Sequence, residues 1–189
     1  MRFNSHVERL VDVTVALVNA LTPGRAGGRP VVVPEGDALV AAVAHVVRDE
    51  GYEPRPSLED AVGLRDVARC AREVFDALAA ADEDRAAAVV NDMLQVTDTR
   101  PRLDPQPGGG YSVHFHGPAD SFARAWGAGV AIGLAMAIGG DLVSRLGVCA
   151  APQCDRVYVD LSKNSHRRFC SVRCQNRVKT AEYRRRGRR

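Results

Sequence analysis

The amino-acid sequence predicts a mainly α-helical protein, with a helical N-terminal domain over residues 1–146 and a small C-terminal module over residues 147–189. Three observations lead to this prediction. Apolar residues recur at helical spacing in five successive segments, clear alternation of apolar and polar residues is confined to one short stretch, and four of the five cysteines lie close together near the C-terminus. A chain of 189 residues is long enough for one substantial core and a small appended module.

Two helices are expected in the first fifty residues. Apolar side chains at helical spacing run from Ser5 to Leu21, and Pro23-Gly24 stops that helix. The segment GRAGGRP that follows is interpreted as a loop, and residues 31–33 as a short extended piece. A second amphipathic helix is predicted over residues 37–48, and it breaks at Gly51.

The middle of the chain predicts two further helices. Ser57 with Asp60 three residues later resembles a capping box, with Asp in place of the usual Glu, and it begins a helix that extends to about residue 81. Cys70 occupies an apolar position of this helix and is expected to be inert core. A fourth helix is predicted over residues 82–96, and the stretch DTRPRLDPQPGGG after it is expected to be a loop.

One strand and one helix complete the N-terminal domain. Alternation puts Tyr111, Val113 and Phe115 on one face, which favours an edge strand or half of a short hairpin. Residues 118–146 predict the last helix of the core. Its uncharged run, residues 125–140, is rich in Ala and Gly and shorter than the roughly 20 apolar residues of a membrane span, so we interpret it as a buried helix.

The cysteines of the C-terminal module are spaced as zinc ligands. Cys149 and Cys154 form a Cys-x4-Cys pair, and Cys170 and Cys174 form a Cys-x3-Cys pair. Two close pairs separated by a short excursion can meet tetrahedrally around one Zn²⁺, which would be structural because four sulfur ligands leave no position open for substrate or water. The module is too small to fold alone, so the metal must supply folding energy, about 10–16 kcal/mol in isolated finger peptides. We expect zinc loss to unfold the module and leave the helical domain intact.

The residues around the cysteine pairs predict a knuckle, a hairpin and a helix, which is the layout of a treble-clef zinc finger. Residues 157–159 are β-prone, residues 162–165 form a turn, and residues 167–169 return toward the metal. Ser171 is a suitable N-cap for a final helix over residues 172–186.

The C-terminal module resembles the CGNR zinc finger of bacterial proteins through the motifs CAAPQC, VYVD, SKN, RRFCS and CQNR. It departs from that family at Gln175, where the family has Gly, and at Phe169, where the family has Trp; the first change puts in doubt any role that needs close backbone approach there. Family members usually carry a preceding helical domain called ABATE-like, which Asn19, Leu64-Arg65 and Asn91 resemble. The resemblance implies a stress-induced transcription regulator.

Positive charge is concentrated in the C-terminal module. Residues 149–189 hold 12 Lys and Arg against 3 Asp and Glu, which leaves 14 against 20 for residues 1–148, so polyanions are the expected partners. On the last helix, Arg173, Arg177 and Arg184 fall on one stripe that could follow phosphates. The residues expected to contact nucleic acid are Arg167, Arg168, Arg173, Gln175, Asn176, Arg177, Lys179, Arg184, Arg185 and Arg186.

These observations predict a zinc-dependent DNA-binding protein that regulates bacterial transcription, with a helical domain that senses a ligand. The alternative is a zinc-stabilised module that binds RNA or an acidic protein surface without sequence-specific DNA binding. A third interpretation is a solvated terminal helix whose arginines only keep the protein soluble or pair with the acidic N-terminal domain. A homodimer would suit paired contacts on DNA.

An enzyme, a membrane protein and an exported protein are not expected. His114 and His116 share a strand face, but no acid–base partner has an identifiable position, and Gly108–Gly110 lacks the Lys-Ser/Thr of a phosphate-binding loop. His166 is a competing zinc ligand, although its place beside the turn favours solvent or phosphate. Acidic residues near the N-terminus argue against an export signal, and the paired cysteines favour a reducing compartment, the cytoplasm.

Overall fold

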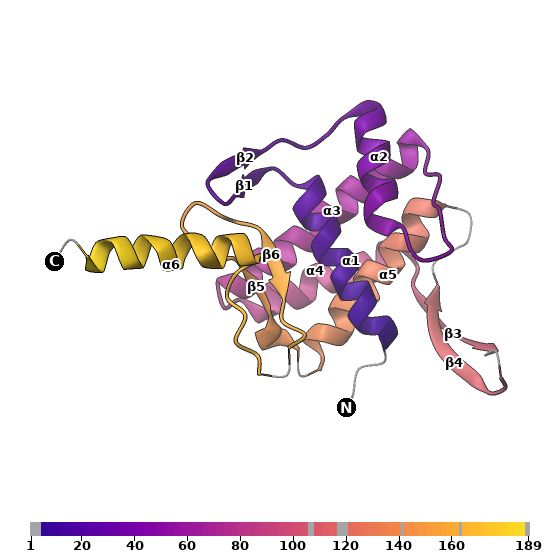
Figure 1. Cartoon of the computed structure of the whole chain (residues 1–189). Helices are drawn as coiled ribbons and strands as arrows, with labels where there is room; N and C mark the ends of the chain where they lie inside the picture. The colour runs from indigo at the N-terminus through magenta and orange to yellow at the C-terminus, as the bar shows by residue number, and fades with distance from the viewer. Residues whose placement is uncertain (1–4, 106–107, 117–120, 141, 163, 188–189) are drawn as a thin grey trace.

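The computed structural model describes residues 5–105, 108–116, 121–140, 142–162 and 164–187 (Figure 1). Its helices are α1 (Ser5–Leu21), α2 (Gly36–Val47), α3 (Leu58–Ala79), α4 (Glu83–Val96), α5 (Phe122–Ile138) and α6 (Val172–Arg186). Its strands are β1 (Gly24–Ala26), β2 (Arg29–Val31), β3 (Arg100–Pro105), β4 (Tyr111–His116), β5 (Leu146–Val148) and β6 (Val157–Val159). The mainly helical fold class predicted from the sequence is confirmed.

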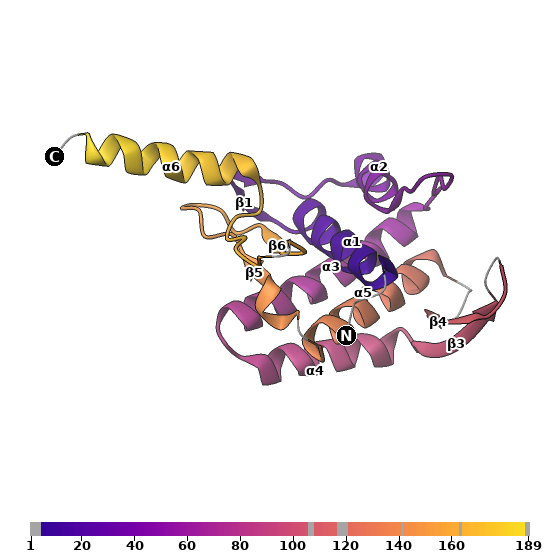
Figure 2. The same cartoon turned by 60° about the horizontal axis from the view of Figure 1, so that its bottom comes forward.

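The strands form separate antiparallel pairs, β1–β2, β3–β4 and β5–β6. Each pair is a two-stranded ribbon, and a ribbon of this size is marginally stable unless it packs on something else. The β5–β6 pair belongs to the C-terminal module, the β1–β2 pair lies beside that module, and the β3–β4 pair projects from the helical body (Figures 1 and 2). The body itself is therefore held together by helix packing.

Helix α3 is the centre of the helical body and contacts α1, α2, α4 and α5. Its start is fixed by the capping box that the sequence predicts: the Asp60 N–H donates to Ser57 Oγ at 3.1 Å, and the Ser57 N–H donates to Asp60 Oδ2 at 2.9 Å. A hydrogen bond from the Ser57 hydroxyl to Asp60 Oδ2, followed by the one from the Ser57 N–H, lowers the pKa of the Asp60 carboxyl. The largest fully buried side chains around α3 include Leu17, Leu39, Leu64, Phe75 and Leu134.

Small residues let α5 approach its neighbours closely. A Cβ built on Gly133 would lie 3.0 Å from Leu10 Cβ of α1, and one built on Gly127 would lie 3.1 Å from Val67 Cγ2 of α3. Helix α5 ends at Ile138 because Gly139-Gly140 follows, so the prediction of one helix through residue 146 is wrong after Ile138. A 3-10 turn, Val143–Arg145, and strand β5 occupy that part instead. The predicted start at Pro118 lies outside the described residues.

Two other local predictions are corrected. The segment GRAGGRP is not an irregular loop: it contains most of the β1–β2 hairpin, and the extended residues end at Val31 instead of beginning there. Cys70 is exposed and not buried in the core. At 100° per residue, Cys70 lies roughly 120° around α3 from the centre of the buried stripe, which puts it at the boundary of that stripe.

The β3–β4 ribbon uses part of the segment that the sequence predicts as loop. Strand β4 confirms the predicted strand, and Leu103 pairs with Val113 across the ribbon. Both side chains belong to its apolar face and are exposed. The side chains of His114 and His116 lie outside the described part of the chain. The ribbon and α6 project from opposite ends of the body (Figures 1 and 2).

Within the described residues, the structure has no helix that combines the length and the apolar character needed to cross a bilayer.

Candidate zinc centre and basic helix

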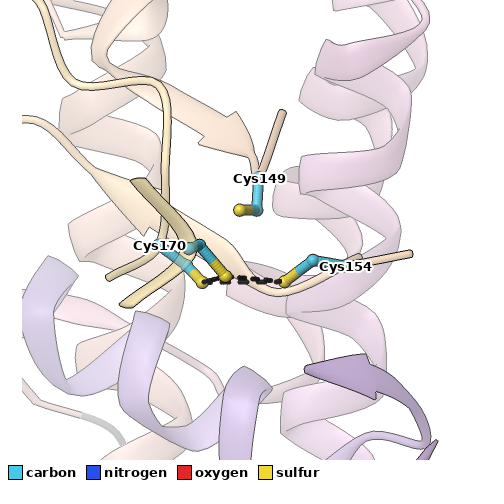
Figure 3. A group of neighbouring side chains, drawn as sticks. Cys149, Cys154 and Cys170 are labelled. Atoms are coloured by element: carbon cyan, nitrogen blue, oxygen red, sulfur yellow. Dashed lines mark hydrogen bonds between the residues drawn. The ribbon is translucent and has the colours of Figure 1, made fainter. Parts of the chain in front are cut away.

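The four cysteines of the C-terminal module meet at one point. Their sulfur atoms all lie within 4.8 Å of one another. The Sγ atom of Cys154 is 3.7 Å from that of Cys170 (Figure 3). The Cys174 sulfur is 3.7 Å from that of Cys154 and 3.8 Å from that of Cys170. A tetrahedron with zinc–sulfur bonds of about 2.3 Å has edges of about 3.8 Å. The four sulfurs therefore fit one structural Zn²⁺.

The first cysteine pair lies at the tip of the β5–β6 hairpin. Strand β5 pairs with β6 in the register Leu146↔Val159, and the Cys149 N–H donates to Arg156 O at 2.8 Å where the strands open into the knuckle. Gln153 closes the knuckle with a left-handed φ of 54°. The β5–β6 hairpin, the finger hairpin of this module, is thus built from residues on both sides of the first cysteine pair.

Residues 157–159 pair with β5, and not with residues 167–169 as the sequence predicts. Residues 167–169 do return toward the metal, but they form no strand; Arg168 O accepts the Ala150 N–H at 2.9 Å instead. The chain is turned earlier by Asp160, whose carboxylate accepts the N–H groups of Ser162 at 3.0 Å and Arg167 at 2.6 Å. A hydrogen bond from the Ser162 hydroxyl is the largest cause of the lowered pKa of Asp160.

The second cysteine pair is placed by the start of α6. Ser171 is the N-cap, as predicted, and its Oγ accepts the Cys174 N–H at 3.3 Å. Cys174 therefore lies in the first turn, where the positive end of the helix dipole favours a thiolate. Phe169 and Val178 pack against the cysteine cluster and keep its apolar side closed.

The environments of the thiols differ. Burial raises the pKa of Cys149 and of Cys170. Burial also opposes ionisation of Cys154, but backbone hydrogen bonds from Gly27 and Arg156 outweigh it and leave the pKa of Cys154 lowered. Zinc binding must therefore displace protons from at least part of the cluster, which makes zinc affinity fall as the solution becomes more acidic.

The β1–β2 hairpin of the N-terminal domain lies directly beside the zinc knuckle. The Gly28 N–H donates to Gln153 O at 2.8 Å, and the Asp155 N–H donates to Arg25 O at 3.0 Å. At Gly24 there is no room for a side chain, since an added Cβ would lie 2.3 Å from Asp155 Oδ2. The surroundings of the metal therefore come from both ends of the chain.

Two polar side chains join α1 to the C-terminal module. The Arg156 guanidinium, 4% exposed, donates to three carbonyls at the end of α1: Asn19 O at 3.0 Å, Thr22 O at 3.0 Å and Pro23 O at 2.9 Å. The Asn19 amide donates to Val157 O at 2.9 Å and accepts the Val157 N–H at 2.8 Å, so it satisfies the free edge of β6. Both strands of the finger hairpin also bury apolar side chains in the main core, namely Leu146, Val157 and Val159.

Sequence reasoning missed this junction, although one signal was present. Gly27 and Gly28 have φ values of 58° and 92°, the left-handed pair that a two-residue hairpin turn requires. Gly-Gly is a typical pair for such a turn and was the available signal, although the flanking residues Gly24–Ala26 and Arg29–Val31 are poor in β-forming side chains. Nothing in the sequence indicates that its partner is a zinc knuckle more than a hundred residues away.

The basic residues predicted to contact nucleic acid fall into two groups. Arg167 and Arg177 are engaged within the module. The Arg167 guanidinium donates to Val159 O at 3.0 Å and to Cys170 O at 2.8 Å, and Arg177 donates to Pro152 O. Gln175 is half-buried. Arg167 is exposed despite these bonds, and the other exposed side chains of the predicted set are Arg168, Arg173, Asn176, Lys179, Arg184, Arg185 and Arg186. Among the described residues, the metal-binding group contains cysteines and no histidine, so His166 is not one of its members.

The fold and the site together define a class of protein, a helical domain joined to a four-cysteine zinc finger. Residues 12–147 match the ABATE family, described as "Putative stress-induced transcription regulator", and residues 145–187 match the CGNR zinc finger. The chain belongs to the ABATE family and ends in a CGNR zinc finger, as the sequence motifs predict. Neither is an enzyme family. A search of curated proteins found no match to this chain.

Proposed function

We propose that this protein is a zinc-dependent DNA-binding regulator of bacterial transcription, in which the C-terminal module contacts DNA and the helical domain senses a ligand. Residues 1–146 are the proposed sensing domain and residues 147–189 the proposed DNA-binding module. The proposed compartment is the cytoplasm, because the four ligand thiols and the exposed Cys70 need a reducing environment.

The projection of α6 is the observation that supports DNA binding most directly. From Lys179 to Gly187 every described residue of this segment is exposed. Figures 1 and 2 both show the helix extending beyond the body. Its first turn carries Cys174, a member of the cysteine cluster. A rigid helix that is free along most of its length can enter a groove of duplex DNA. Its arginines supply the positive field that binding to phosphates requires.

The exposed side chains suggest a division of labour on DNA. Lys179 and Arg184–Arg186 suit phosphate contacts, which fix position without reading sequence. Arg173 and Asn176 are exposed nearer the zinc centre, and their side chains can form bidentate hydrogen bonds with base edges. Arg168 lies in the exposed segment before α6 and suits a phosphate on the flank. Arg167 and Arg177 would act indirectly, by fixing the module that presents the helix.

Fluorescence anisotropy with the zinc-loaded full chain tests this proposal. The probes are a random-sequence DNA duplex, a pool of genomic promoter duplexes and a single-stranded RNA, each titrated at several salt concentrations. We expect the promoter pool to bind more tightly than the random duplex and the RNA. The logarithm of the affinity should fall with the logarithm of the salt concentration, with a slope of about −0.9 for each phosphate contacted. Replacing Arg184, Arg185 and Arg186 together by Gln should weaken binding and flatten this slope.

The matched control removes the same charge elsewhere. Arg48, Arg55 and Arg69 are exposed arginines of the helical body, and replacing all three by Gln lowers the net charge by the same amount. Equal loss of affinity in both triple variants would contradict the proposal, because the attraction would then come from net charge and not from α6.

A specific observation favours the second candidate function, binding to RNA. Tyr183 is 80% exposed on α6 and lies beside three arginines, and exposed aromatic rings among cations stack on unpaired bases. Tighter binding to single-stranded RNA than to duplex, lost in a Tyr183→Ala variant, would replace the DNA proposal with this one. Binding to an acidic protein surface instead would leave both nucleic acids weak at physiological salt.

A homodimer is the assembly we propose for the DNA-bound form, because two copies can contact two half-sites separated by one helical turn. Sedimentation velocity of the chain with and without duplex tests it. A complex that contains one protein copy per duplex at saturation would contradict this part of the proposal.

A further inference from the structure

A cleft between α3 and α4 is a feature of the helical domain that helix packing does not use. Its volume is about 340 Å³, within the range of small-molecule sites. Its apolar lining includes Val67, Val89, Met93 and Val96, and the Cys70 side chain also lines it. Val96 is 78% exposed although it belongs to this apolar surface. An apolar concave surface of this size, left open to solvent, can accept the apolar part of a ligand.

The charged groups around the cleft favour a positive ligand. Three carboxylates, those of Asp66, Glu73 and Asp92, line it together with one arginine, Arg85. Two of the carboxylates are engaged by arginines, since Arg69 lies 3.1 Å from Asp66 and Arg85 lies 3.1 Å from Glu73. Within the described part of the chain, no ion pair is found for Asp92. A ligand cation is therefore the group that would complete the charge balance at the rim.

The same stretch of α3 lines the cleft and contacts the zinc module. Glu73 lines the cleft, and its neighbour Arg72 donates to Asp155 O at 2.5 Å, in the segment directly after the zinc knuckle. Arg72 is held for this contact by a two-oxygen bond to Asp76, with its Nε 2.9 Å from both carboxylate oxygens. One turn of α3 therefore both lines the cleft and contacts the segment after the zinc knuckle.

We propose that the α3–α4 cleft binds a small lipophilic cation, with its apolar body over Val89, Met93 and Val96 and its positive charge beside Asp92. This inference gives a place and a chemistry to the ligand-sensing role of the proposed function, and its importance for regulation rests on that role. Binding to the cleft itself does not require DNA, so the two can be tested separately.

Isothermal titration of the zinc-loaded full chain with tetraphenylphosphonium tests the proposal, and tetraphenylborate, an anion of the same shape, is the comparison. Residues 1–148, which carry the cleft, hold 14 Lys and Arg against 20 Asp and Glu, so general attraction to this domain also favours the cation, and the cleft variants decide whether binding belongs to this site. We expect the cation to bind at one site and more tightly than the anion, by up to about fivefold, the upper value of an exposed ion pair. Failure of the cation to bind, or equal binding of both ions, would overturn the proposal.

Two variants locate the site without disturbing the core. Asp92→Asn should weaken cation binding by about threefold to fivefold, whereas Asp37→Asn, an exposed acid of α2, should leave it unchanged. Val96→Arg places a fixed cation at an exposed position of the cleft and should abolish binding, and melting temperature shows whether each variant is folded. Wild-type affinity in both cleft variants would show that the ion binds elsewhere and would overturn the proposal.

Cys70 provides an independent readout. Zinc protects the other four cysteines, so a maleimide should label the zinc-loaded chain at Cys70. Saturating tetraphenylphosphonium should slow that labelling, and the anion at the same concentration should not. Unchanged labelling in the presence of bound cation would place the ion outside this cleft. If the chain does not bind DNA in a separate assay, the proposed function is contradicted, whereas cation binding to the cleft is not.

Discussion

The two halves of the zinc finger have opposite surroundings. The half before the metal, which contains β5, the knuckle and β6, is built into the helical body: Val157 is fully buried and Arg156 is 4% exposed. The half after the metal ends in α6, where Val172 is 70% and Tyr183 80% exposed. Zinc joins an anchored hairpin to a projecting helix. The direction of α6 is therefore set by the contacts that hold the β5–β6 hairpin on α1 and beside the β1–β2 hairpin.

Removal of zinc should have the largest effect on the contrast between the anchored hairpin and the projecting helix. Cys154→Ser should abolish stoichiometric zinc, measured by elemental analysis, and should unfold α6, seen as lost helical signal in circular dichroism. We also expect the helical body to lose stability, because Val157 and Val159 belong to its core. The chain has one tryptophan, Trp126 of α5, so tryptophan fluorescence follows the body separately.

This expectation differs from the one that the sequence alone supports, which treats the module and the helical domain as separate folding units. A fluorescence melt of Trp126 that is unchanged in Cys154→Ser would support the separate units and contradict the coupling inferred from the junction. Cys70→Ser is the matched control, since Cys70 lies outside the metal cluster and its loss should leave zinc content and the Trp126 transition as they are.

The next largest effect is expected at Arg156. Arg156→Ala removes a buried cation that bonds three carbonyls at the end of α1 and just after it, and it breaks the ion pair of Arg156 with Asp155 at 2.6 Å. We expect a loss of about 3 kcal/mol in the free energy of unfolding, the lower end of the range for breaking a buried charged pair, because Asp155 is partly exposed. Urea unfolding followed by Trp126 fluorescence measures it. Arg168→Ala, at an exposed arginine of the same module, should cost less than about 0.5 kcal/mol; equal costs would show that the junction contributes little.

A smaller effect is expected at Asn19. Asn19→Ala removes both hydrogen bonds to the edge of β6 and should cost about 2 kcal/mol. Asn19→Asp keeps an acceptor for the Val157 N–H and loses the donor to Val157 O, so its cost in urea unfolding should separate the two bonds. An Asn19→Ala variant as stable as the native chain would contradict the view that this amide holds the finger hairpin on α1.

The difference between local contacts and contacts distant in the chain explains which parts of the structure the sequence predicts. Local signals identify local structure: the bounds of α1 and α6, the Ser57–Asp60 capping box and the four-cysteine cluster all follow from residues within one helix or one short module. The errors arise where a residue's partner is distant in the chain. Strand β5 is not predicted, and its first residue, Leu146, is assigned to the preceding helix, because its pairing with β6 leaves no trace in its three residues. Cys70 is predicted as core because its apolar neighbours do not show where the buried stripe of α3 ends.

Charge patterning predicts the basic module but does not separate the two roles that its arginines have. The charge pattern does not single out Arg156, and it predicts nucleic-acid contacts for Arg167 and Arg177. In the structure these three arginines donate to backbone carbonyls of the junction and of the zinc module. An arginine that fixes the module and one that faces solvent have the same side chain and the same charge, so only the tertiary contacts distinguish them.

The smallest effect on stability is expected at the free end of α6. Replacing Arg184, Arg185 and Arg186 by Gln removes three exposed charges from a segment where every described side chain is exposed. The free energy of unfolding should therefore change by less than about 0.5 kcal/mol for each substitution, even though nucleic-acid affinity falls. Removing the cations also weakens the favourable interaction with the helix C-terminus, so any fraying should be confined to the last turn. A loss comparable to that of Arg156→Ala would mean that α6 packs on another part of the protein in solution, and the contrast between an anchored hairpin and a projecting helix would no longer hold.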